Sequence, residues 1–141
     1  MPTVRLVVDA PVGPLFGYLA DPRNRPQWQS SLRRVEEVSG SGELATTWYD
    51  VTVIGARPWL EVTEYEPERV WAEHGRWHGL EASLVVGFAG VDERRTELSV
   101  RVDFWGSGIY RLAGWGMNAI TPAGVRSDLR RAARLVARQP R

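Results

Sequence analysis

Cysteine and lysine are both missing from the 141-residue sequence, and no long apolar run occurs in it. The lack of cysteine excludes disulfide bonds and thiolate metal sites. All 18 basic residues are arginine, a bias that GC-rich bacterial coding explains as well as a functional need does. No apolar stretch approaches the ~20 residues of a membrane span, and the start, MPTVRLVVDAP, lacks the apolar segment of a signal peptide. We therefore expect a bacterial, cytoplasmic protein with no integral membrane association.

Charge and length narrow the class further. The 18 basic and 17 acidic residues leave a formal net charge of +1, which argues against a nucleic-acid-binding protein. A chain of 141 residues can bury a stable core without disulfide bonds or metal ions, so we expect one domain, residues 1–141. The chain also carries 7 tryptophans, so it has much aromatic surface to place.

The hydrophobic pattern predicts a strand, one or two short helices, six further strands and a long C-terminal helix. Residues 3–9 form the first predicted strand, and the apolar residues of 10–20 recur at helical spacing. A second helical turn is expected at 23–29. Turn residues then separate strand-like runs at 32–39, 44–54, 59–65, 69–77, 80–88 and 95–105. Because no connection is long enough for a helical crossover, we expect antiparallel pairing.

The final segment, residues 109–138, is predicted to cover one face of this sheet. The second half has the stripe of an amphipathic helix, with arginines on the opposite side. Its apolar members are Val125, Leu129, Ala132 and Val136. Thr121 and Pro122 interrupt the segment, either as an N-cap with a first-turn proline or as a kink. A curved sheet around one such helix can leave a cavity between them.

The order of these elements resembles the START-like, helix-grip superfamily (SRPBCC), particularly its bacterial polyketide cyclase/dehydrase and lipid-transport group. Four segments carry the resemblance in order and spacing: VDAPVGPLFGYLADPRNRPQW, LEVTEYEPERVW, RRTELSVRVDF and SDLRRAARLVA. The implied fold class is α+β, a curved antiparallel sheet of about seven strands wrapped around the long C-terminal helix. Two positions depart from the family pattern. Glu68 stands where a hairpin has its second proline, and Pro122 breaks the last helix.

The resemblance implies a hydrophobic pocket between sheet and last helix, although it does not fix a function. We expect a hydrophobic small-molecule ligand (a lipid, polyketide or aromatic metabolite) to contact Trp28, Leu84, Phe88, Val100, Val102, Phe104, Trp115 and Met117. No cofactor or metal is expected, and a homodimer is left open. One alternative is a polyketide cyclase/dehydrase-like enzyme that folds a reactive chain in the same cavity. Another is a protein-interaction module, which would need an exposed apolar patch.

Three polar side chains are candidates for the proton transfers of such an enzyme. The strand parity of His74, Glu64 and Tyr49 matches that of apolar neighbours, which would turn all three toward the cavity. The same parity places Trp48 on the outer face. Structural alternatives are a histidine bonded to a neighbour or exposed, and a glutamate paired with an arginine. His78 lies four strand residues from His74, roughly 13 Å away, too far to share a metal ion.

Trp28 ends the polar stretch DPRNRPQW, where a large apolar side chain is unexpected. Two roles are open for it. It can act as a plug or hinge at the cavity mouth, packing against the last helix near Trp115 and Met117, or it can simply close the core.

Overall fold

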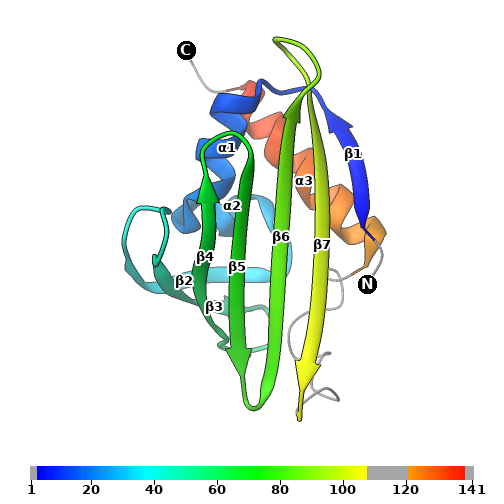
Figure 1. Cartoon of the computed structure of the whole chain (residues 1–141). Helices are drawn as coiled ribbons and strands as arrows, with labels where there is room; N and C mark the ends of the chain where they lie inside the picture. Colours follow the sequence, from blue (N-terminus) through cyan, green and yellow to red (C-terminus); the bar gives the residue numbers. More distant parts are fainter. Residues whose placement is uncertain (1–2, 108–120, 139–141) are drawn as a thin grey trace.

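The computed structural model describes residues 3–107 and 121–138. Within them, seven strands form one antiparallel sheet in the order β1-β7-β6-β5-β4-β3-β2, with the helices on one side of it (Figure 1). Along the chain the elements are β1 (Val4–Val8), α1 (Val12–Ala20), a 3-10 turn (Pro22–Asn24), α2 (Arg25–Trp28), β2 (Leu32–Ser39), β3 (Thr47–Thr52), β4 (Trp59–Glu66), β5 (Val70–Trp77), β6 (Leu80–Gly90), β7 (Thr96–Gly106) and α3 (Pro122–Ala137). None of the helices in these residues is long and apolar enough to cross a membrane.

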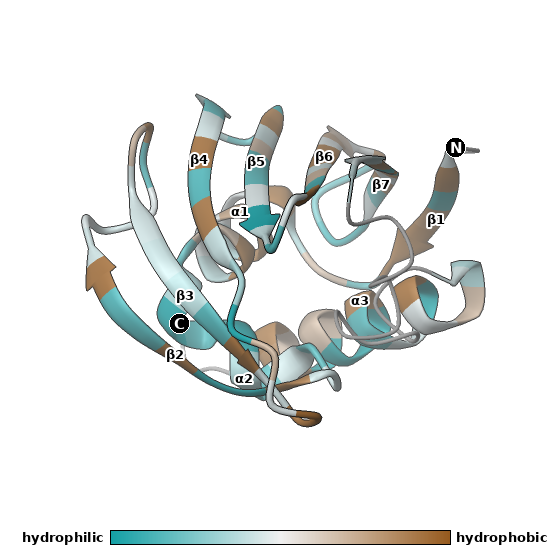
Figure 2. Ribbon diagram, turned by 90° about the horizontal axis from the view of Figure 1, so that it is seen from below, coloured by the Kyte–Doolittle hydropathy of each residue, from teal (hydrophilic) through white to brown (hydrophobic). Residues whose placement is uncertain are grey.

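The sheet is curved, and the helices lie inside the curve. Figure 2 shows β2 and β3 turning down on the side of α2, while β7 and β1 lie over α3. The predicted helix-grip fold is therefore confirmed. The first strand forms one edge of the sheet, where β1 pairs with β7, with Val4 opposite Val100 and Leu6 opposite Leu98.

The inner face of the sheet and the apolar stripe of α3 form the core, as the alternation predicts. On β6 and β7, Leu84 pairs with Val102 and Phe88 with Leu98, so that their side chains share the covered face. The apolar stripe of α3 is buried against this core.

The start of α3 decides between the two readings of its threonine and proline. The Thr121 hydroxyl accepts a hydrogen bond from the Gly124 amide at 3.0 Å, and Pro122 occupies the first turn. The N-cap reading is therefore correct. Residues 109–120 of the predicted segment lie outside the described residues.

A β-bulge in β4 changes which side chains face the core. Val62 pairs with Glu73 and Glu64 with Ala72, so Thr63 is an extra residue with no partner across the strand pair. Glu64 is consequently exposed, and the prediction that it faces the cavity is wrong. Tyr65 takes the inner face instead, with its ring edge-on to Phe16 of α1 at 5.4 Å between centroids.

The turn between β4 and β5 explains one departure from the family pattern. The Arg69 amide donates to the Glu66 carbonyl at 3.0 Å, and Glu68 has a φ of 65°. Proline is locked near −65° and cannot adopt this conformation. A second proline at position 68 is therefore incompatible with this turn.

Candidate functional site

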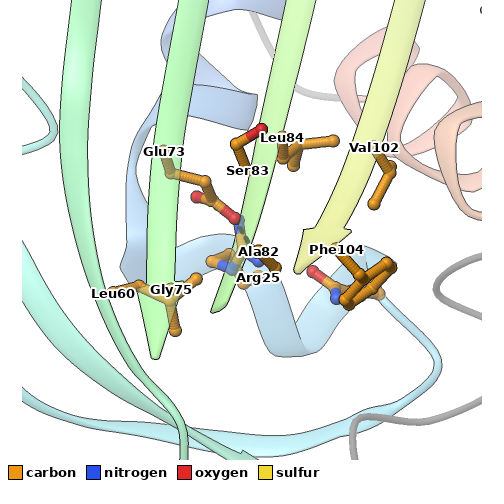
Figure 3. A pocket seen from close by; sticks show the side chains of 10 residues that line it. Arg25, Leu60, Glu73, Gly75, Ala82, Ser83, Leu84, Val102 and Phe104 are labelled. Atoms are coloured by element: carbon orange, nitrogen blue, oxygen red, sulfur yellow. Dashed lines mark hydrogen bonds and ion pairs between the residues drawn. The ribbon is translucent and has the colours of Figure 1, made fainter. Parts of the chain in front are cut away.

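Two adjoining pockets lie between the inner face of the sheet and the helices. The polar pocket (Figure 3) is lined by Arg25, Gln29, Leu60, Glu73, Gly75, Ala82, Ser83, Leu84, Val102 and Phe104. The apolar pocket is lined by Trp28, Gln29, Trp71, Leu84, Val86, Val100, Val125, Asp128 and Leu129. Gln29 and Leu84 line both, so the two pockets meet along these side chains.

A buried charge cluster stands at the wall of the polar pocket. Arg25, only 2% exposed, projects from α2 toward the sheet. Its Nη1 donates to Glu73 Oε2 at 3.1 Å, and its Nη2 lies 3.0 Å from Glu73 Oε1 and 3.5 Å from Asp50 Oδ2. Figure 3 shows the Arg25 and Glu73 side chains converging from opposite sides. We call Arg25, Asp50 and Glu73 the buried triad.

Three indole rings surround the guanidinium of the buried triad. The Arg25 carbon Cζ lies 5.8 Å from the ring centre of Trp28, 5.4 Å from that of Trp48 and 5.7 Å from that of Trp71. Each ring is within the range of a cation–π contact. The Trp48 Nε1 also donates to Asp50 Oδ1 at 2.9 Å. The arginine therefore has aromatic faces as well as carboxylates to replace its lost hydration.

Local strand geometry assembles this cluster. Trp48 and Asp50 are two residues apart on β3, and Trp71 and Glu73 are two apart on β5. Side chains at i and i+2 share a face of a strand, so each carboxylate points the same way as its tryptophan. Burying the two large rings therefore carries both acids inward.

The pKa values of the buried triad are shifted because two carboxylates share one arginine in a site that excludes water. Burial raises the pKa of Glu73 to about 7, since the attraction of Arg25 only partly offsets it and the negative charge of Asp50 adds to it. Burial also raises the pKa of Asp50, against the opposing effects of Arg25 and the Trp48 donor. Burial opposes the charge on Arg25, but the two carboxylates outweigh it and raise its pKa. Near neutral pH, Glu73 can therefore hold or release a proton at the pocket wall.

Five of the eight residues predicted to contact a ligand line one of the two pockets. Trp28, Leu84 and Val100 line the apolar pocket, and Val102 and Phe104 line the polar one. Phe88 faces inward but lines neither pocket, since its ring packs edge-on against Phe16 at 5.0 Å. Trp115 and Met117 lie outside the described residues. Trp28 is both a core residue and a pocket wall, so its two predicted roles are not exclusive.

The three predicted proton-transfer residues do not meet at either pocket. His74 is on the outer face, with its Nε2 2.9 Å from Glu81 and its ring stacked on Trp105 at 5.6 Å. Tyr49 is also on the outer face, where the Arg57 guanidinium carbon lies 3.8 Å from its ring centre. With Glu64 turned outward by the bulge, the prediction that these side chains enter the cavity is wrong for all three.

The sequence prediction placed the side chains of β3 and β5 on the wrong sides of the sheet. Strand alternation says which residues share a face, but not which face is covered. The small aliphatic residues beside Tyr49 and His74 suggested the core, whereas the large rings of Trp48 and Trp71 occupy it. The prediction that Trp48 faces outward is therefore wrong.

The buried triad was missed because each member looks solvated in its local sequence. One signal was present: a tryptophan stands two residues before Asp50, two before Glu73 and three after Arg25. Among residues 3–107 and 121–138, no group of three or more His, Cys, Asp or Glu side chains is placed to hold a metal ion.

Comparison with known proteins places this geometry in context. A family model described as polyketide cyclase / dehydrase and lipid transport matches residues 2–139. No curated protein sequence matches the chain. The structure resembles the Zhui aromatase/cyclase from a Streptomyces species, with a TM-score of 0.76, 17% identity, and 99% of this chain and 94% of that one covered.

Two further solved structures share the architecture at lower identity. A START superfamily protein from Mycobacterium smegmatis has a TM-score of 0.73 and 12% identity, covering 95% of this chain and 97% of that one. Norcoclaurine synthase from Thalictrum flavum has a TM-score of 0.71 and 10% identity, covering 98% and 86%. Identities this low show a common fold, and the chemistry must be argued from the residues of this chain.

Proposed function

The chain belongs to the polyketide cyclase/dehydrase and lipid-transport family, and from that premise we propose that it binds a hydrophobic small molecule between the sheet and α3. The observation that carries this proposal is the apolar pocket. Its walls are mostly aliphatic and aromatic, and come from α2, β5, β6, β7 and α3. Ligand sites typically combine such walls with a few placed polar groups, as the adjoining polar pocket supplies.

A flat aromatic or polyketide-like ligand fits these walls better than a flexible lipid tail. Two of the wall residues are tryptophans, whose rings offer broad faces for stacking. Support comes from norcoclaurine synthase, which shares the fold and has been solved in complex with dopamine and hydroxybenzaldehyde. Both of those ligands are small and aromatic.

Naphthalene titrated into isotope-labelled protein tests the proposal by NMR. We expect saturable shifts at residues of the apolar pocket, such as Val86 and Val100. Val100→Phe fills the pocket and should weaken binding at least tenfold. The matched control is Val85→Phe, because Val85 pairs with Arg101 on the outer face of the neighbouring strand. Absence of pocket shifts, or equal weakening by both variants, would contradict the proposal.

A second candidate function, cyclisation or dehydration by acid–base chemistry, is favoured by one observation. The Glu73 carboxyl lines the polar pocket, and burial raises its pKa to about 7. A group that exchanges a proton near neutral pH suits enolisation, in which a base removes a hydrogen beside a carbonyl. Arg25 holds the carboxyl from both oxygens and fixes its orientation.

Exchange of the acetyl hydrogens of 2-acetylnaphthalene in D2O measures this enolisation directly. Glu73→Gln should lower the protein-dependent exchange rate by roughly a hundredfold while the ketone still binds. Glu81→Gln, on the outer face beside His74, is the matched control and should leave the rate unchanged. Equal rates for the protein and its Glu73→Gln variant would remove this second function and leave ligand binding intact.

A further inference from the structure

The three indoles around Arg25 differ in how their N–H groups are used. Trp48 donates to Asp50 at 2.9 Å. The Nε1 atoms of Trp28 and Trp71 are buried, and neither has a hydrogen-bond partner among the described residues. Trp28 is 5% exposed and Trp71 only 1%. Most buried polar groups in proteins are paired, so two orphaned donors at one site need an explanation.

Both orphaned indoles line the same apolar pocket. The other walls are mostly aliphatic side chains of β6, β7 and α3. The carboxylate among them, Asp128 of α3, accepts a hydrogen bond from the Ser30 amide at 3.3 Å and is bonded to neither indole. Gln29 lies at the junction with the polar pocket, and its Oε1 is likewise buried and unpaired among the residues described. Two hydrogen-bond donors and one acceptor without partners among the described residues therefore lie together around the pocket in which a ligand would bind.

We propose that the ligand is a flat apolar molecule bearing a carbonyl or phenolic oxygen, and that the Nε1–H groups of Trp28 and Trp71 donate to that oxygen. This inference rests on the proposed function, since it describes the ligand of the same pocket. The apolar part of the ligand packs against the aliphatic walls, while its oxygen accepts a hydrogen bond from each of the two indole N–H groups. A pure hydrocarbon of the same shape would fill the space and leave both donors unpaired.

The consequence is selectivity for an oxygen over a carbon at one position of the ligand. A donor left unpaired in an apolar site loses its hydrogen bond to water without replacement. We therefore expect the oxygen-bearing ligand to bind about tenfold to a hundredfold more tightly than its hydrocarbon isostere.

The test compares 2-acetylnaphthalene with 2-isopropenylnaphthalene, which has a CH2 group in place of the carbonyl oxygen. Both are titrated into the 15N-labelled full chain, and Kd is read from shifts of pocket residues. The indole Nε1–H signals of the 7 tryptophans report the contact itself. We expect the signals of Trp28 and Trp71 to move downfield with the ketone only, and that of Trp48 to stay in place because its donor is already engaged.

Substitution of single tryptophans provides a second, independent test of whether the two indoles donate to the ligand oxygen. Trp28→Phe removes one donor and should shrink the preference for the ketone severalfold. Trp59→Phe is the matched control, since Trp59 lies on the outer face with the Arg76 guanidinium over its ring at 4.7 Å. If Trp28→Phe does not fold, the indole shifts of the unchanged protein still decide.

The outcomes separate the two proposals. Tighter binding of the ketone with downfield shifts of the two indoles supports the inference. Equal binding of both compounds in the pocket, with no indole shift, overturns the inference and leaves the proposed function standing. Binding of neither compound contradicts the proposed function as well.

Discussion

The two faces of the sheet carry matching charge clusters with opposite properties. Inside, Arg25 meets Asp50 and Glu73, and outside, Arg57 meets Glu36 at 2.9 Å and Glu37 at 2.6 Å. In each cluster one arginine bridges two carboxylates and has an aromatic ring beside its guanidinium, and in the outer cluster Glu36 also pairs with Arg34 at 2.8 Å. The outer side chains are 41%, 33% and 70% exposed for Arg57, Glu36 and Glu37, whereas those of the buried triad are almost fully covered.

The pKa values of the two clusters move in opposite directions. Hydrogen bonds from Arg34 and Arg57 lower the pKa of Glu36, whose side chain remains partly exposed to water. Burial raises the pKa of Glu73 even though its arginine is equally close. Glu36 has two arginine partners and Glu73 has one, but burial is the largest effect on the pKa of Glu73, so the loss of water sets the direction of its shift. Four predictions can break or sharpen this comparison.

Removing the arginine gives the largest contrast. Arg25→Met leaves two buried carboxyls without a cation and should cost about 3–5 kcal/mol of unfolding free energy. Arg57→Met on the outer face should leave the unfolding free energy close to that of the unchanged protein, because exposed pairs are well solvated. Urea denaturation of both variants measures the two values. Similar costs on the two faces would mean that burial is not what distinguishes the clusters.

The pH dependence of stability should have opposite signs for the two glutamates. The folded pKa of Glu73 is about 7, above its usual value of 4.5, so its contribution is complete below pH 4.5 and is lost as pH rises toward 7. Between pH 4.5 and 8 the protein should lose about 3 kcal/mol relative to Glu73→Gln.

Glu36 provides the opposite case for the same measurement. Its folded pKa is lowered, so its contribution is present above the unfolded pKa and lost as pH falls through the folded one. Unfolding free energies of the protein, Glu73→Gln and Glu36→Gln compare the two directly when measured from pH 8 down to well below pH 4.5, because the Glu36 contribution is lost only there. A Glu73 difference that does not change with pH would show that its carboxyl titrates normally.

The tryptophans extend the comparison to neutral side chains. Trp48→Phe leaves one oxygen of Asp50 without its donor and shrinks a buried ring, so a loss of roughly 2 kcal/mol is expected. Trp59→Phe, on the outer face, should cost less than half as much. Chemical denaturation of both variants makes the test, and a larger loss for Trp59 would reverse the expected order.

Salt should give the smallest effect and the simplest control. At ~1 M NaCl the Debye length is about 3 Å, which screens exposed charges but reaches buried ones poorly. Any difference between the protein and Arg57→Met should therefore disappear in salt, while the cost of Arg25→Met stays nearly unchanged. Repeating the denaturation at low and high salt measures this, and strong salt sensitivity of the Arg25 variant would argue for water around the triad.

The fold could be predicted because its signals are local and repeated. A short stretch of sequence is enough to identify the buried side of β6, β7 and α3. The signals are the alternation that includes Leu84, Val100 and Val102, and the apolar stripe of α3. The same holds for the Thr121 cap, whose hydroxyl bonds an amide three residues on.

The site was only partly predictable because its polar members depend on distant partners. Nothing in DPRNRPQW marks Arg25 as buried, since the carboxylates that permit it lie 25 and 48 residues along the chain. Parity in β3 and β5 left the covered face undetermined, and His74 and Tyr49 were placed on the wrong one. The aliphatic residues that line the pockets could be predicted because their burial alone places them on the inner face.

The bulge at Thr63 makes one position of β4 tolerant to a change in chain length. Deleting Thr63 would leave Glu64 opposite Ala72 and Tyr65 opposite Trp71, because the extra residue is the one without a partner. A deletion before it, within the regularly paired stretch, would instead exchange the inner and outer side chains of that half of the strand. A relative of this protein could thus lose a residue here and keep its pocket lining, whereas the same loss a few residues earlier would create a different binding surface.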